Sequence, residues 1–309
     1  MFGFFNNNKP GPGISKEQAA RRNYFDIYGR HFGHITGLNL LYVLTNIIFF
    51  LLAFGLFRVY FIGTNGDNFV YIASCILTGK NFIVPILPFV PFMFIGPFTA
   101  GYTYVIRNYA KQEPTFLISE YFEHAKKNFK QAIIVSVLSV FVLYVLIQAF
   151  VFYNSFFITN GLPVAVFYTI FAIVFALFLI LMFYIYPIMV TFKMDLKVIL
   201  KNAWTFTILK LPQNAIILIF LLAVNLGLAY LMCFVAYLSS IFYFIVLAVF
   251  LTGFTAFTAN YYIWHVLDKY IVKYVKPKRE NDAVFNDDEY PELNDEYDME
   301  AIVEDEYLL

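Results

Sequence analysis

The stretch VAVFYTIFAIVFALFLILMFYIYPIMV, residues 164–190, decides the fold class of this chain. It contains no Asp, Glu, Lys or Arg. About 20 apolar residues, each adding about 1.5 Å to a helix, are enough to cross the roughly 30 Å hydrocarbon core of a bilayer. The stretch therefore predicts a transmembrane helix.

Five further segments meet the same criterion and also lack charged residues: 35–57, 82–106, 132–152, 215–237 and 241–263. The weakest division is Leu238-Ser239-Ser240, where the last two spans would need a very tight turn. Five spans is therefore the competing count. We predict an all-α, polytopic membrane bundle of about six spans over residues 35–266.

The composition of the whole chain agrees with this prediction. Of 309 residues, 61% are hydrophobic and 14% are charged, where soluble domains have about 45–50% and about 25%. The mean hydropathy is +0.70. These values exclude an ordinary soluble domain.

Basic residues predict the orientation, because Lys and Arg accumulate in cytoplasmic loops. With the N-terminus inside, the cytoplasmic segments hold 19 of the 21 Lys and Arg residues, and the outer segments hold only Arg58 and Lys80. Six spans also return the basic segment 267–279 to the cytoplasm, which favours six over five. We expect a multi-pass protein with both termini in the cytoplasm.

Each odd-numbered span is preceded by a segment with helical periodicity, which we call an elbow. The first lies within residues 1–34, where Ser15 to Gln18 form a capping box. The second covers 115–130, and the third precedes Leu211-Pro212, which we expect to end it. Their apolar stripes are Phe25, Tyr28, Phe32 and Ile35, then Ile118, Phe122, Ala125 and Phe129, and then Leu196, Ile199, Leu200 and Ala203.

A basic amphipathic helix beside a membrane most simply lies in the headgroup plane. Its apolar face would then lie in lipid and its lysines would face anionic phosphates. For the second elbow we expect Lys126, Lys127 and Lys130 to contact anionic lipids of the inner leaflet.

The order of elbow, span, span occurs three times. Asn39, Gln131 and Asn214 each stand where an elbow turns into a span. A threefold repeat of helical hairpins is one interpretation. The other is that any series of cytoplasmic entries into a membrane produces such an order.

Polar side chains within the spans are few: Asn46, Gln148, Asn225 and Asn260. Such groups usually form hydrogen bonds between transmembrane helices. A polar track for a solute would instead require the four to converge. We also expect no buried charge, which argues against a transporter coupled to protons or sodium.

The second span carries Pro85, Pro88, Pro91 and Pro97, which predict a kinked helix. Small residues form one face in this span and another in the sixth span: Gly96 and Ala100, and Gly253 and Ala256. We expect these two faces to pack against each other. A ligand site at the kink is the alternative.

Residues with catalytic or metal-binding potential form no recognisable site. Nucleotide-binding, metalloprotease, hydrolase and redox motifs do not occur in the sequence. His31 and His34 are three residues apart without a third ligand, and Cys75 and Cys233 form either a disulfide or two unpaired thiols. We expect no enzyme activity, no cofactor, no metal and no nucleic-acid partner.

The last segment, 280–309, contains 13 acidic residues and no basic one, whereas the preceding 279 residues carry a net charge of +13. Such a composition predicts disorder. Its spaced aromatic residues could dock on a basic or grooved partner. A purely solvated tail is the alternative.

Four stretches carry a resemblance to a known family: KPGPGISKE (9–17), GPFTAGYTYVIRNYAKQE (96–113), EYFEHAKKNFKQA (120–132) and LKNAWTFTILKLPQNAIIL (200–218). They resemble the YesL-like family, bacterial integral membrane proteins with a domain of unknown function. The resemblance covers roughly residues 9–275 and not the acidic tail. It implies a bacterial plasma membrane and an association with carbohydrate ABC importers and their sensor systems, and it implies no catalytic residues.

Two functions remain open. One is a non-enzymatic accessory or scaffold subunit of a carbohydrate uptake or sensing system. The other is a stand-alone transporter or channel for a small solute. A polar cavity lined by the four intramembrane amides would favour transport, and a dry, packed core would favour the accessory role.

Overall fold

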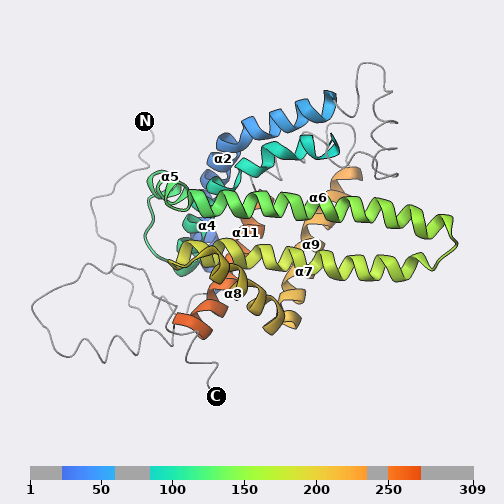
Figure 1. Ribbon diagram of the computed structural model, residues 1–309. Helices are drawn as coiled ribbons and strands as arrows, with labels where there is room; N and C mark the ends of the chain where they lie inside the picture. Colours follow the sequence, from blue (N-terminus) through green and yellow to red (C-terminus); the bar gives the residue numbers. More distant parts are fainter. Residues whose placement is uncertain (1–22, 60–83, 235–249, 273–309) are drawn as a thin grey trace, which may run out of the picture.

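The computed structural model describes residues 23–59, 84–234 and 250–272, and these ranges form helices with no strand among them (Figure 1). In chain order the helices are α2 (Tyr24–Phe57), η2 (Val84–Phe94), α4 (Gly96–Lys111), α5 (Leu117–Lys127), α6 (Phe129–Thr159), α7 (Val164–Thr191), α8 (Leu196–Leu209), α9 (Leu211–Phe234), α11 (Thr252–Leu267) and η4 (Asp268–Val272).

The predicted all-α membrane bundle is confirmed. In the described residues, α2, α6, α7 and α9 are each long and apolar enough to cross a membrane. The helices η2 and α4 make a fifth span if they are taken as one element bent by 47°. The predicted sixth span begins outside the described residues, and α11 covers its second half.

The bend in the second span lies at Ile95, between the 3₁₀-helix η2 and the α-helix α4. Pro88 and Pro91 lie inside η2, where each removes a backbone donor that an α-helix would use. Pro97 lies in the first turn of α4, a position at which a missing N–H costs little. The kink predicted from the prolines is therefore present.

The first elbow differs from the sequence prediction. No break separates it from the first span, because α2 runs without interruption for 34 residues, about 51 Å of helix. The interval contains no proline to end the helix. Its first turns are held against α11, where the Tyr24 hydroxyl bonds to Thr258 Oγ1 at 2.7 Å and the Tyr28 ring packs against Phe257.

The second and third elbows are separate short helices, α5 and α8, which precede α6 and α9. In α8 the structure changes one expectation, because Ile199 and Ala203 have no exposed surface and pack in the protein core instead of facing lipid. Pro212 begins α9 rather than ending α8. We call the end of the bundle that carries α5 and α8 the elbow end.

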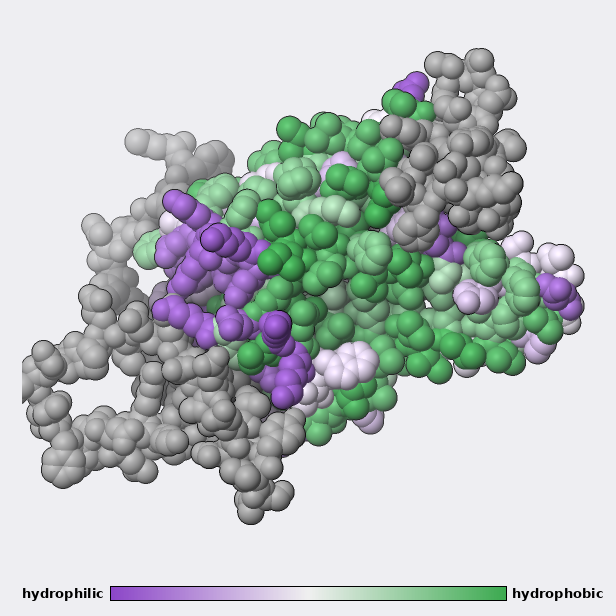
Figure 2. Space-filling model, in the orientation of Figure 1, coloured by the Kyte–Doolittle hydropathy of each residue, from purple (hydrophilic) through white to green (hydrophobic). Residues whose placement is uncertain are grey.

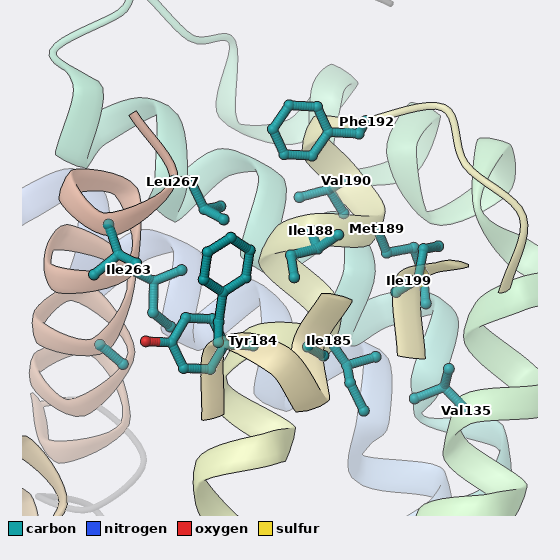
Figure 3. Close-up of a cluster of buried hydrophobic side chains, with 14 of the residues drawn as sticks. Val135, Tyr184, Ile185, Ile188, Met189, Val190, Phe192, Ile199, Ile263 and Leu267 are labelled. Carbon is teal, nitrogen blue, oxygen red and sulfur yellow. The ribbon is translucent and has the colours of Figure 1, made fainter. Parts of the chain in front are cut away.

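Three helices form the centre of the bundle. Helices α4, α7 and α11 pack against one another, and α2 and α6 pack on their outer sides. The space between the three central helices is filled by fully buried apolar side chains, among them Ala100, Ile188 and Ile263. Figure 3 shows this cluster, in which the Tyr184 ring of α7 lies toward Ile263 of α11 and Ile185 lies on the side of Val135 of α6.

Glycines allow α4 to approach its neighbours very closely. A Cβ atom added at Gly96 would lie 2.2 Å from the carbonyl oxygen of Ala132 in α6. A Cβ added at Gly101 would lie 2.1 Å from the carbonyl oxygen of Tyr121 in α5. Because both obstacles are backbone atoms, no side-chain rotation can relieve the clash.

Gly101→Ala should therefore destabilise the bundle, by about 1–3 kcal/mol as for other overpacked sites. The matched control is Gly227→Ala in α9, where an added Cβ meets nothing within 4 Å and helix propensity predicts a gain of about 0.5–1 kcal/mol. Thermal unfolding in detergent would measure both. Equal melting temperatures for the two variants would contradict the packing described here.

Candidate functional site

The last turns of α4 carry a buried cationic and aromatic cluster at the elbow end. The helix ends at Lys111, and the next residue, Gln112, has a φ of 61°. The N–H groups of Gln112 and Glu113 bond back to Tyr109 O and Asn108 O, the pattern that closes many helix C-termini. A left-handed Gln costs some free energy, and the two bonds of this turn end α4 directly after Lys111.

Arg107 is the centre of this cluster and is 7% exposed. Its Nη1 atom donates to Val190 O at 2.9 Å and to Thr191 Oγ1 at 3.0 Å, at the end of α7. Its Nε and Nη2 atoms donate to Asn108 Oδ1 at 3.1 and 2.8 Å. The rigid, forked guanidinium thus bridges two central helices.

The expectation that the bundle holds no buried charge is wrong at Arg107. The sequence places this residue one position beyond the predicted end of the second span, in a loop. The structure extends the helix to Lys111 and turns Arg107 toward α7. The sequence offered one signal, the Arg-Asn pair that follows the apolar run of the second span.

Tyr104 lies between Arg107 and an imidazole from α5. The His124 ring is stacked on the Tyr104 ring, with 3.3 Å between centroids and 10° between planes, and the Arg107 guanidinium carbon lies 4.6 Å from the same ring centroid. Burial, together with the positive charges of Lys127 and Arg107, lowers the pKa of His124 to about 4. His124 is therefore uncharged at neutral pH, which lets it pack beside a guanidinium.

Helices α2 and α11 also contact α4 through ring stacking and a cation–π contact. His31 of α2 stacks on Tyr109 at 4.8 Å between centroids, and His34 contacts the same ring at 6.0 Å. Lys111 pairs with Glu113 at 2.8 Å and lies 4.3 Å above the Trp264 ring of α11. In the part of the chain that the structure describes, no group of three His, Cys, Asp or Glu side chains could hold a metal.

The four intramembrane amides lie on four different helices. Asn46 and Asn260 donate to carbonyls of their own helices, Tyr42 O and Ala256 O, at 2.8 Å each. Asn225 donates to Leu221 O and to Thr255 Oγ1 of α11. Gln148 of α6 bonds to the hydroxyl of Tyr144 one turn earlier. No bond among these joins two of the four, and their role stays a prediction.

The small residues of α4 and α11 have separate surroundings. The closest neighbours of Gly96 belong to α6, and those of Gly253 are Asn39 and Ile35 of α2. Ala100 is fully buried in the central core, and Ala256 packs beside the cluster around Phe257. Helices α4 and α11 do pack against each other, with each glycine turned toward another helix.

The predicted lipid-facing lysines, Lys126, Lys127 and Lys130, are exposed at the corner between α5 and α6. Phe122 and Phe129 are exposed beside them, by 45% and 52%. Figure 2 shows hydrophilic residues gathered at the elbow end, next to a broad hydrophobic surface. This position suits a headgroup boundary, and the lipid contact itself stays a prediction.

Sequence reasoning missed a set of buried tyrosine hydroxyls that bond to amides. Tyr102 donates to Asn39 Oδ1 at 2.6 Å, and Tyr184 and Tyr262 donate to Asn214 Oδ1 at 2.7 and 2.9 Å. The remaining one of the three repeated positions, Gln131, donates to Met194 O at 2.8 Å. All three amides marked by the repeat therefore tie one elbow-to-span junction to a neighbouring helix or connection.

Arg107→Met should destabilise the fold, because it leaves Val190 O and Asn108 Oδ1 buried without their donor, at about 1–3 kcal/mol for each group. Arg107→Lys should recover only part of the loss, since an ammonium cannot reproduce the fork. Arg30→Met, at an exposed position of α2, is the control. Thermal unfolding in detergent should rank Arg107→Met lowest, and a value equal to the Arg30→Met value would contradict the bridging role.

Comparison with known proteins places this cluster inside a recognised segment. Residues 68–154 match the family model described as "Protein of unknown function, DUF624". No curated protein and no solved structure gives a significant match. The matched segment contains α4, α5 and most of α6, so it includes Arg107, Tyr104 and His124 but only one side of the bridge to α7.

Proposed function

We propose that this chain is a non-enzymatic scaffold of the YesL-like family, which assists a carbohydrate uptake or sensing system in a bacterial plasma membrane. The observation that carries the proposal is the packed, apolar axis of the bundle. Ala100, Ile188 and Ile263 meet between α4, α7 and α11 with at most 1% of their surface exposed. A solute path along this axis would have to displace close-packed side chains.

The polar groups of the described helices support the same proposal. The hydroxyls of Tyr102 and Tyr184 donate hydrogen bonds to Asn39 and Asn214. The side-chain N–H groups of Asn46 and Asn260 donate to carbonyls of their own helices. The two tyrosine–amide pairs join neighbouring helices and stabilise the bundle. The oxygens of Asn46 and Asn260 are buried without a hydrogen-bond partner among the described residues, so these two amides add no such support.

The elbow end supplies a surface on which a protein partner could dock. Helix α8 exposes Trp204 and Ile208, by 49% and 46%, on the same side as Lys197 and Lys201. Trp is enriched in protein interfaces and among the residues that contribute most to binding. A transport or sensor subunit on the same side of the membrane is the partner that the family resemblance implies.

A stand-alone transporter is the second candidate, and two observations favour it. The second span is bent by 47°, and broken helices line the binding sites of many transporters. Arg107 is a buried charge close to the membrane boundary, and such residues often mark substrate paths. The packed axis and the bonds of Arg107 to α7 weigh toward the scaffold.

We also propose that the elbow end faces the cytoplasm, because the topology expected from the sequence assigns 19 of the 21 basic residues to cytoplasmic segments. In a background with Cys75→Ser and Cys233→Ser, Lys80→Cys and Thr159→Cys should react with an impermeant thiol reagent in whole cells. Lys127→Cys should react only after the cells are permeabilised. Labelling of Lys127→Cys in intact cells would reverse the orientation.

The scaffold proposal is tested with the purified chain in liposomes and by capture from native membranes. Liposomes should take up labelled sugars and cations no faster than empty ones, with an ionophore as positive control. Capture should recover a transport or signalling subunit, several-fold less of it with Trp204→Ala, and as much as wild type with Leu226→Ala, which is 65% exposed on α9. Robust flux from the chain alone would overturn the scaffold in favour of the transporter.

A further inference from the structure

One surface of the elbow end concentrates positive charge around α8. We call it the α8 lysine surface and define it as Lys193, Lys197 and Lys201. Lys197 and Lys201 are one turn apart on the exposed side of α8, and Lys193 is exposed in the connection before it. The acidic residue nearest to these three in the chain is Asp195.

Two further lysines gather at Tyr270, beside the end of α8. The Lys210 ammonium bonds to the Tyr270 hydroxyl and lies 4.1 Å from the centroid of its ring. The Lys269 ammonium lies 5.6 Å from the same centroid. The hydrogen bond from Lys210 lowers the pKa of Tyr270, and the charges of both lysines act in the same direction. Two ammonium groups on one ring favour a negatively charged neighbour.

The described part of the chain ends close to Tyr270. Tyr270 also packs against Phe206 of α8, with 6.5 Å between ring centroids, and the described chain ends two residues later at Val272. The acidic segment begins at residue 280. Seven residues lie between, and when extended they span roughly 23 Å.

The lysines lie within this reach. Lys201 precedes Lys210 by nine residues of helix and Lys197 by thirteen, about 14 and 20 Å along α8. A tethered segment also has an effective concentration in the millimolar range at a nearby site. We propose that residues 280–309 dock on the α8 lysine surface of the same chain.

Charge complementarity supports this occupant over an anionic lipid. The segment carries 13 acidic residues and no basic one, and the rest of the chain has a net charge of +13. A lipid headgroup brings only one or a few charges at a time, whereas this segment can pair with several lysines together. We expect lipid to contact the other group of exposed lysines, Lys126, Lys127 and Lys130. That group is the control surface in the experiments that follow.

Docking would cover lysines that lie on the same side of α8 as Trp204, the residue on which the proposed partner depends. A partner would then have to displace the segment, so its binding would increase when the segment is removed or neutralised. This consequence rests on the proposed function. The docking itself does not, and it is tested on the isolated protein.

Carbodiimide cross-linking tests where the acidic segment lies. The full chain is placed as single copies in nanodiscs of phosphatidylcholine alone, treated with the carbodiimide, digested and analysed by mass spectrometry. We expect amide bonds between acidic residues of 280–309 and Lys197, Lys201 or Lys210, with several-fold lower yield in 0.5 M salt at about a 4 Å Debye length. Links confined to the basic residues of 273–279, or to Lys126, Lys127 and Lys130, would overturn the proposal.

Two matched triple variants test whether the α8 charges are the cause. Glutamyl endopeptidase should cleave within 280–309 several-fold faster in Lys193→Gln/Lys197→Gln/Lys201→Gln than in wild type, and at the wild-type rate in Lys126→Gln/Lys127→Gln/Lys130→Gln. Neutralising Asp287, Asp288 and Asp295 to Asn leaves the membrane bundle untouched and should lower the cross-link yield in parallel. Equal cleavage in the two lysine variants, or cross-links formed only between labelled and unlabelled copies, would refute docking on the same chain.

Discussion

The bridge from Arg107 to the end of α7 is the interaction on which the elbow end depends. A guanidinium in a membrane bundle carries a large desolvation cost unless every N–H finds an acceptor. Val190 O and Thr191 Oγ1 of α7 each accept one bond, and Asn108 Oδ1 of the same helix accepts two more. Because the two acceptors on α7 have fixed directions, they favour one rotation of α4 about its own axis and one position of α4 along α7.

That single rotation determines what the other faces of α4 contact. With Arg107 on α7, Tyr104 receives the His124 ring of α5 and Tyr109 receives the His31 ring of α2. Gly96 and Gly101 then lie directly against backbone carbonyls of α6 and α5. Close approach at the glycines and polar bonding at the arginine therefore support each other, and either one alone would leave α4 free to rotate.

The sequence predicted the elements whose signal is local. Runs of apolar residues located the spans, and helical periodicity located α5 and α8. The burial of Arg107 could not be predicted from the sequence, because its acceptor at Val190 is 83 residues away and hydropathy assigns a charged residue to a loop. The continuity of α2 was missed for a related reason, because the contacts of Tyr24 and Tyr28 that hold its first turns come from α11.

The bend in the second span makes the packed axis possible. A break at Ile95 exposes backbone groups that need partners, and Ser136 Oγ donates to Phe92 O while Thr99 Oγ1 donates to Ile95 O. The break is thus satisfied by side chains of the bundle itself, as buried irregular backbone must be in a membrane. It redirects the chain so that Gly96 meets α6 and Ala100 enters the centre, where Ile188 and Ile263 pack. In this protein a bend of the kind that elsewhere lines a binding site completes a packed core.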